Sequence, residues 1–116
     1  MNKTWLWVTV GLLLVGGGVT STAKAESIFE YTTPTADSSP AGLDFDSQGN
    51  LWFAEINGNR IGRLTPAEVK AGTSKGIVEY ELPHANSKPQ YLIVSRDDSV
   101  WFSETAGNRI GRLDSA

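Results

Sequence analysis

The sequence WFAEINGNRIGRL occupies residues 52–64 and contains two strand patterns joined by a turn. Residues 51–55 alternate with a period of two, which is typical of a half-buried strand. Asn57-Gly58 follows, and this dipeptide is the best suited to a two-residue type I′ hairpin turn. Residues 60–64 supply the returning strand, so the stretch predicts an antiparallel hairpin.

The same stretch recurs 49 residues later as WFSETAGNRIGRL, residues 101–113. The match begins with Ile28 on Ile77 and runs without a gap to residue 64 on residue 113. Self-similarity at a fixed offset is the signature of a repeat architecture. The chain therefore contains two supersecondary units of one kind.

The segment at residues 65–76, TPAEVKAGTSKG, has no counterpart and is typical of a connecting loop. We divide the chain into a leader at 1–25, a first repeat with its connecting loop at 26–76, and a second repeat at 77–116.

The strand pattern predicts an all-β fold with four-stranded blades of the β-propeller type, in a partial or truncated propeller of two repeats. The order is one strand, then three, then one, then three, as expected when a chain starts on the last strand of a blade. The predicted strands are 28–31, 42–46, 51–55, 60–64, 77–82, 91–95, 100–104 and 109–113.

The hairpin register places complementary side chains opposite one another in both repeats. Glutamate faces arginine, a guanidinium can lie over an indole, and glycine leaves room for a phenyl ring. Because the pattern occurs in both repeats, we interpret these residues as structural rather than catalytic. They are Trp52, Phe53, Glu55, Arg60, Gly62 and Arg63 in the first repeat, and Trp101, Phe102, Glu104, Arg109, Gly111 and Arg112 in the second.

The leader resembles a secretory signal peptide. Lys3 gives it a positive start, Trp5–Val15 is almost wholly apolar, and Ala23-Lys24-Ala25 is a small-x-small cleavage site. The alternative is an uncleaved anchor, but the apolar run is shorter than the roughly 20 residues that span a bilayer. We expect cleavage after Ala25, a secreted or periplasmic product and no stable membrane anchor.

Composition narrows the function classes further. The chain is 40% hydrophobic and 20% charged, it has no cysteine, and its net charge is −3. It lacks the basic surplus that nucleic-acid binding requires, and its stability cannot depend on disulfides.

The pattern E-Y-x-x-P, then P-x-x-L, then W-F-x-E-x-x-G-N-R-I-G-R-L resembles the repeat of the virginiamycin B lyase (streptogramin B lyase) family over residues 28–113. The resemblance implies one blade of a seven-bladed propeller for each repeat. It also implies an activity that linearises cyclic depsipeptides by elimination, and a magnesium ion. Two repeats are present here, so a truncated or split member is indicated.

The resemblance also places catalytic histidines directly after the proline that opens a blade's inner strand. The matching positions are Ala41, after Pro40, and Gln90, after Pro89. Neither side chain can act as a base or ligate a metal as imidazole does. The one histidine, His84, lies in a polar loop and is a weak catalytic candidate. Any catalytic group would then lie outside these two repeats.

Asp44, Asp46 and Glu55 match positions 1, 3 and 12 of a calcium-loop template. These three residues are weak metal candidates, since that loop joins helices whereas this segment alternates like a strand. Asp44 and Asp46 are explained more simply as the outward side of a half-buried strand. The chain itself indicates no cofactor, and magnesium follows from the resemblance alone.

Two functions remain open: a piece of a depsipeptide lyase, or a non-catalytic propeller module that binds a small molecule or a protein. A decayed or wrongly bounded gene is a third possibility. Two blades alone leave broad apolar faces and unpaired strand edges, so we also expect self-association through those faces and edges.

Overall fold

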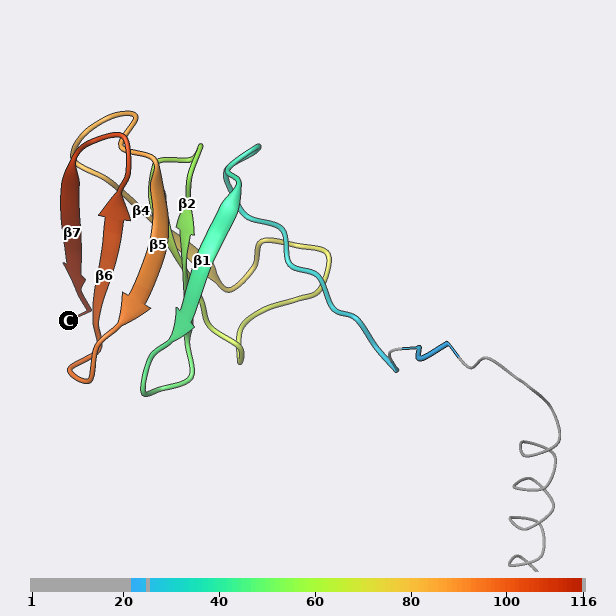
Figure 1. Cartoon of the computed structure of the whole chain (residues 1–116). Coiled ribbons are helices and arrows are strands. Elements are labelled where there is room, and N and C mark those ends of the chain that lie inside the picture. The colour runs from blue at the N-terminus through green and yellow to red at the C-terminus, as the bar shows by residue number, and fades with distance from the viewer. Residues whose placement is uncertain (1–21, 25, 116) are drawn as a thin grey trace, which may run out of the picture.

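The computed structural model describes residues 22–24 and 26–115 (Figure 1). Residues 1–21 and Ala25, which make up most of the predicted signal peptide, lie outside that range. The described part is all-β, as predicted, and contains no helix long and apolar enough to cross a membrane. Its strands are β1 (Pro40–Phe45), β2 (Leu51–Glu55), β3 (Arg60–Leu64), β4 (Ile77–Glu81), β5 (Pro89–Val94), β6 (Ser99–Glu104) and β7 (Arg109–Asp114).

The strands form two antiparallel sheets, one of four strands in the order β1-β2-β3-β4 and one of three in the order β5-β6-β7. Spatial order equals chain order in both, which is the up-and-down arrangement of a propeller blade. The two sheets lie side by side in Figure 1. β4 opens the second sequence repeat yet completes the sheet of the first, so each blade is offset by one strand from the sequence repeat.

The predicted register is observed in both hairpins. Glu55 pairs with Arg60 across β2 and β3, and Glu104 pairs with Arg109 across β6 and β7. The predicted two-residue turn at Asn57-Gly58 is wrong. The loop has four residues, Asn59 takes the positive φ of 57°, and its N–H donates to the Glu55 carbonyl at 2.9 Å.

Close packing explains why Gly58 stands in that loop. A Cβ at this position would lie 2.7 Å from Glu55 Oε2 and 3.0 Å from the Ser38 Cβ. Glycine is needed here for space rather than for a positive φ.

The segment at 28–31, which was predicted to be a strand, is exposed coil. A strand needs a neighbour that pairs with its backbone groups. β4, the repeat equivalent of residues 28–31, has such a neighbour because it pairs with β3. The equivalent neighbour of residues 28–31 is the third strand of a preceding blade, and the described residues contain no such strand. The segment instead follows loop 65–76, where the Glu30 carbonyl accepts from Gly72 N–H at 2.8 Å.

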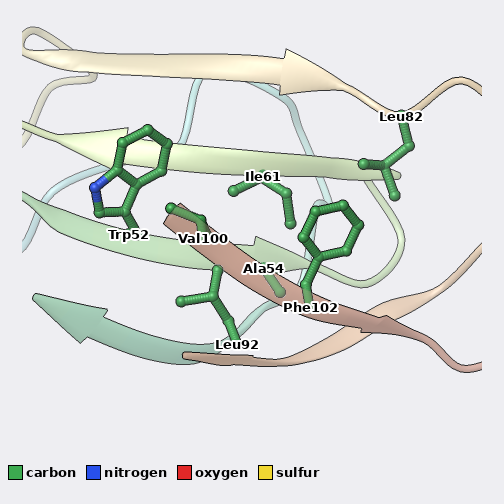
Figure 2. Packing of buried hydrophobic residues seen from close by; sticks show 7 residues of the cluster. All are labelled: Trp52, Ala54, Ile61, Leu82, Leu92, Val100 and Phe102. Atoms are coloured by element: carbon green, nitrogen blue, oxygen red, sulfur yellow. The ribbon is translucent and has the colours of Figure 1, made fainter. Parts of the chain in front are cut away.

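The core lies between the two blades (Figure 2). Alternate residues of each strand face the neighbouring blade, and burial of their apolar surface stabilises the contact. In the first blade Trp52 also stacks on Tyr80, with ring centroids 5.8 Å apart. The cluster comprises Trp52, Ala54, Ile61, Leu82, Leu92, Val100 and Phe102.

Candidate functional site

Three ionisable side chains lie close together on the outer face of the first blade, the face turned away from the second blade. Glu55 ends β2, Arg60 begins β3 opposite it, and Glu79 lies in β4 opposite Gly62. Arg60 Nε is 3.8 Å from Glu79 Oε2. Thr35 donates to Glu79 twice, from its N–H at 2.9 Å and from its hydroxyl at 2.6 Å.

Glu55 is completely buried, and among the described residues no N–H or O–H of another group donates to either of its carboxyl oxygens. Burial raises the pKa of Glu55 to about 8, the neighbouring Glu79 carboxylate contributes to the increase, and the Arg60 charge opposes it. Near neutral pH Glu55 is therefore mostly protonated, and its neutral carboxyl group lies beside the Glu79 carboxylate.

Glu79 has the opposite character. Burial acts to raise the pKa of Glu79, but hydrogen bonds from Thr35 and Glu55, together with the Arg60 charge, outweigh burial and lower it. Arg60 therefore pairs with Glu79 and not with Glu55, and the predicted Glu55–Arg60 ion pair is wrong. Arg60 Nη1 donates instead to the Gly58 carbonyl at 2.8 Å.

Glu104, the repeat equivalent of Glu55 in the second blade, has a different hydrogen-bond partner. Glu104 Oε2 accepts from Arg109 Nε at 3.1 Å, which is the predicted cross-strand ion pair. No fourth strand covers this sheet in the described part of the chain, so Glu104 has no counterpart of Glu79. An open pocket of about 410 Å³ lies beside it and is lined in part by Tyr91, Arg109 and Ile110.

The other predicted structural contacts are present in both blades. The Arg63 guanidinium carbon lies 5.7 Å from the centroid of the Trp52 ring, and Arg112 lies 5.4 Å from that of Trp101. A Cβ at Gly62 would overlap the Phe53 ring, and one at Gly111 would overlap the Phe102 ring.

The positions that the family resemblance assigns to histidines lie beside the buried glutamates. Pro40, next to Ala41, pairs with Glu55, and Pro89, next to Gln90, pairs with Glu104. Ala41 and Gln90 are both partly exposed. A methyl group and a neutral amide thus occupy the places of the imidazoles, and neither can transfer a proton.

His84 lies in the exposed loop between β4 and β5. Its backbone carbonyl accepts from Asn59 Nδ2 and from the Ser87 hydroxyl, both at 2.9 Å. The loop therefore uses the backbone of His84 to connect the two blades, while the imidazole is directed to solvent.

Asp44 and Asp46 have structural partners. Asp44 Oδ2 accepts from Val94 N–H of the second blade at 2.9 Å, and Asp46 Oδ2 accepts from Trp52 Nε1 at 2.9 Å. Burial acts to raise the pKa of Asp46, but hydrogen bonds from Trp52 and Asn50 outweigh burial and lower it. These carboxylates hold the blade contact and the β1–β2 turn.

The carboxylates do not combine into a metal site. Asp44 lies opposite Trp52, whereas Glu55 lies opposite Pro40 at the other end of β2. Residues 22–24 and 26–115 contain no group of three or more His, Cys, Asp and Glu side chains that could hold a metal ion. The residues present therefore do not fit the magnesium ion that the resemblance implies.

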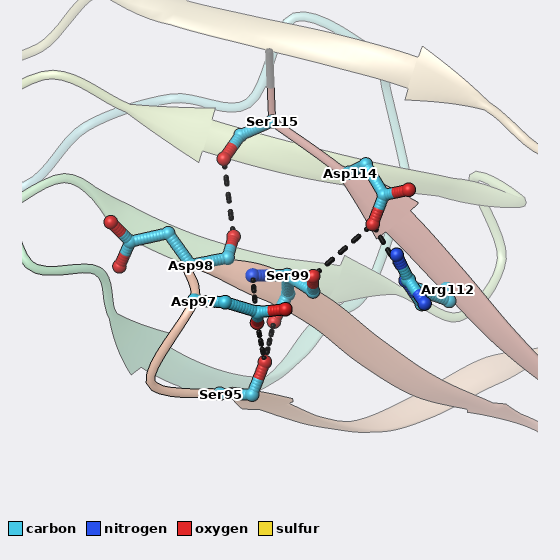
Figure 3. A network of polar contacts seen from close by, with 7 residues as sticks. All are labelled: Ser95, Asp97, Asp98, Ser99, Arg112, Asp114 and Ser115. Carbon is cyan, nitrogen blue, oxygen red and sulfur yellow. Dashed lines mark hydrogen bonds and ion pairs between the residues drawn. The ribbon is translucent and has the colours of Figure 1, made fainter.

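A second polar network closes the far end of the second blade (Figure 3). Arg112 Nε donates to Asp114 Oδ1 at 2.6 Å, and the Ser115 hydroxyl donates to the Asp98 carbonyl at 3.1 Å. Hydrogen bonds from Ser95 and Ser99 lower the pKa of Asp97 to about 2. These hydrogen bonds connect the end of β7 to the β5–β6 turn and so stabilise the second blade.

Sequence reasoning missed Thr35 and Glu79 as members of the carboxyl site. A signal for Glu79 was present, because the repeat aligns it with Glu30 inside a predicted strand. Thr35 lies in a loop, and alternation of side chains does not position loop residues.

Two sheets that share an apolar core, each with strands in up-and-down order, define the chain as two neighbouring blades of a β-propeller. The Virginiamycin B lyase family model matches residues 3–116, and the chain belongs to that family. The motif and the fold thus lead to the same assignment.

Three solved structures to which the chain is similar are lyases of this kind. One is selenomethionine-substituted virginiamycin B lyase from Staphylococcus aureus, 42% identical with a TM-score of 0.63 over 72% of this chain and 26% of that one. A catalytically inactive histidine-to-alanine variant of the Staphylococcus aureus enzyme with quinupristin is 41% identical, with a TM-score of 0.61 over 71% of this chain and 26% of that one. A streptogramin B lyase structure is 37% identical, with a TM-score of 0.63 over 72% of this chain and 26% of that one.

Virginiamycin B lyase from Bacillus licheniformis is 47% identical over 36 residues, which cover 31% of this chain and 12% of the relative. The chain thus spans about a quarter of the length of the solved relatives.

Proposed function

We propose that this chain is an exported member of the virginiamycin B lyase family whose two blades provide architecture and carry no catalytic group of their own. The observation that supports this most strongly is the occupation of both histidine positions by Ala41 and Gln90, beside glutamates that the blade buries.

The chemistry of the proposed family reaction explains why those residues matter. Opening an ester by elimination needs a base that takes a proton from carbon and an acid that assists the departing carboxylate. A general base works best when its pKa is near the working pH and when it can reach the substrate. Glu55 is inaccessible and mostly protonated, and Glu79 is held by Thr35 and Arg60. In this proposal any lyase chemistry needs groups from other blades.

The test is incubation of the purified protein with quinupristin and magnesium, with the Staphylococcus aureus lyase as the positive control. Elimination leaves the mass unchanged, so linearisation is followed by chromatographic retention and by the signals of the new alkene. We expect a rate at least about 100-fold below the control, the lower bound for loss of a general base. Metal-dependent turnover that disappears in His84→Ala would overturn the proposal.

A binding module is the second candidate, and the exposed apolar side chains on the outer faces favour it. Calorimetric titration with quinupristin separates the two candidates. Saturable binding without turnover supports the module, whereas neither binding nor turnover leaves the architectural role.

Export is the remaining part of the proposal, and the leader pattern supports it. Expression of residues 1–116 in a bacterial host, followed by intact mass measurement of the extracytoplasmic fraction, should give a product that begins at Glu26. A product retained in the cytoplasm with residues 1–25 attached would contradict export.

A further inference from the structure

The free edge of β7 is the place where the second blade differs most from the first. β3 pairs with β4 on this side, whereas β7 has no strand beyond it in the described part of the chain. The side chains next to that edge are correspondingly exposed: Ile110 is 72% exposed, whereas its equivalent Ile61 is 0% exposed. An unpaired edge beside apolar side chains is a template for another strand.

The chain itself carries a segment of the right sequence for that edge. Residues 28–31 read IFEY, and residues 77–80 of β4 read IVEY. The segment is exposed coil, and two backbone hydrogen bonds tether it to loop 65–76, Gly72 N–H to the Glu30 carbonyl and Thr32 N–H to the Thr73 carbonyl. A strand partner would replace these with a ladder of bonds.

The loop that follows this segment has the conformation of a connection between blades. Loop 33–39 precedes β1 as loop 82–88 precedes β5. Its positive φ angles, at Asp37 (53°) and Ser39 (55°), recur at Asn86 (54°) and Lys88 (53°). Its hydrogen bond to the next hairpin, Ile56 N–H to the Ser39 carbonyl, recurs as Thr105 N–H to the Lys88 carbonyl. Loop 33–39 thus directs residues 28–31 to the fourth-strand place of a preceding blade.

We propose that Ile28–Tyr31 of one copy pairs with β7 of a second copy of this chain and completes its second blade. The repeat offset transfers the β3–β4 register to this contact. Tyr31 would then pair with Ile110, as Tyr80 pairs with Ile61. Glu30 would pair with Gly111, as Glu79 pairs with Gly62.

The side chains at those positions fit the existing pattern. Tyr31 would stack on Trp101 as Tyr80 stacks on Trp52. Glu30 would lie against Glu104 and reproduce the carboxyl pair of the first blade. Tyr31 already lines an apolar hollow on the outer face of its own first blade, beside Leu43 and Phe53. It therefore lies where the partner blade would meet that face.

The two free faces of the chain are also the two halves of an interface that it already forms. Leu43 and Phe53 on the free face of the first blade are equivalent to Leu92 and Phe102, which lie in the blade–blade core. On the free face of the second blade, Trp101 and Ile110 are likewise equivalent to the core residues Trp52 and Ile61. One copy can therefore pack on the next as its own blades pack.

A second copy is a better occupant than the same chain. The segment leaves the molecule on the β1 side, and β7 lies at the opposite side (Figure 1). Contacts of this head-to-tail kind form a closed ring or an open chain of copies. Propellers close at about four to eight blades, so a ring would contain two to four copies.

Cysteine pairing tests the register directly, because the chain has no cysteine of its own. Tyr31→Cys and Ile110→Cys are made as separate full-length chains, mixed and oxidised. We expect a disulfide-linked heterodimer as the main product. Tyr31→Cys mixed with Gln48→Cys, which places the thiol in an exposed turn, is the matched control and should give background yield.

An equal yield from the control mixture would overturn the proposed register. Both cysteines are also placed in one chain, and a monomer with an internal disulfide as the main product would overturn pairing between copies.

Proline substitution tests the strand without disturbing the blades. Phe29→Pro together with Glu30→Pro removes the N–H groups of adjacent residues, and one of the two must face β7. Light scattering should show the unsubstituted protein as an oligomer of two to four copies and the variant as a monomer with an unchanged circular dichroism spectrum. Ala67→Pro, in an exposed loop, is the control and should remain oligomeric. A monomeric unsubstituted protein, or an oligomeric proline variant, would refute the proposal.

Discussion

The two blades share the motif W-F-x-E-x-x-G-N-R-I-G-R-L, but they bury it to different extents. Trp52 is 1% exposed and Trp101 is 38% exposed, although both are followed by phenylalanine and face an arginine. Trp52 lies against the second blade, stacks on Tyr80 and donates to Asp46. Trp101 faces outward beside the free edge of β7. A blade motif thus specifies the sheet, and the neighbouring elements decide which of its faces is a core.

The same contrast holds for the glutamates. Glu55 lies beside the fourth strand, β4. Arg60 forms its ion pair with Glu79 of that strand, and Glu55 is mostly protonated near neutral pH. Glu104 lacks that strand and keeps its arginine. One added strand thus separates a repeated motif glutamate from its arginine and leaves it beside another carboxyl group.

Alanine substitution of the two tryptophans should show the largest difference. We expect Trp52→Ala to lower the free energy of unfolding by about 3–5 kcal/mol, because a buried ring is removed. Trp101→Ala should cost less than about 1.5 kcal/mol, because 38% of that residue's surface is already in water. Urea unfolding in the Phe29→Pro, Glu30→Pro background measures each copy without a donated strand. Equal losses in that background would contradict the contrast.

The pH dependence of stability should separate the two glutamates. The folded pKa of Glu55, about 8, lies above its unfolded value of 4.5, so the folded state binds more protons between these values. Stability from this group is complete below about pH 4.5 and is lost as pH rises toward and through 8, with a slope of up to about 1.4 kcal/mol per pH unit.

Glu55→Gln should remove this slope, because the amide does not ionise. Glu104→Gln is the matched control in the second blade and should leave the slope in place. Urea titrations at pH 5, 6, 7 and 8 measure it. A slope that persists in Glu55→Gln would show that another group causes it.

Glycine substitution should affect both blades alike and so mark the limit of the contrast. Gly62→Ala and Gly111→Ala each place a Cβ into a phenyl ring of the adjacent strand, Phe53 or Phe102. Overpacking of this kind costs about 1–3 kcal/mol. Since each contact lies within a single blade, we expect the two losses in unfolding free energy to agree to within about 1 kcal/mol. A loss confined to one blade would mean that the other sheet is not formed.

The smallest effect concerns the arginines. A double-mutant cycle on Glu104 and Arg109 should give a coupling energy of about 0.2–1 kcal/mol, as for a partly solvated ion pair. The cycle on Glu55 and Arg60 should give a smaller coupling at pH 6, because Glu55 is then mostly protonated. A stronger coupling between Glu55 and Arg60 than between Glu104 and Arg109 would mean that Glu55 and Arg60 form an ion pair in solution, contrary to the structure.

The sequence alone determined seven of the eight predicted strands, the hairpin register and the propeller class. Period-two alternation and an ungapped repeat constrain neighbouring residues through local geometry, and the bounds of the seven observed strands lie within two residues of their predictions. Contacts inside one hairpin, such as Gly62 with Phe53 and Arg63 with Trp52, were predictable for the same reason.

Tertiary structure alone decided the exposure of Trp101, the coil at 28–31, the four-residue turn at 56–59 and the protonation of Glu55 beside Glu79. Each of these depends on what lies beside the motif and not on the motif. A backbone edge forms a strand only when a partner offers hydrogen bonds, and a carboxyl group keeps its proton only when burial and a neighbouring charge make ionisation unfavourable.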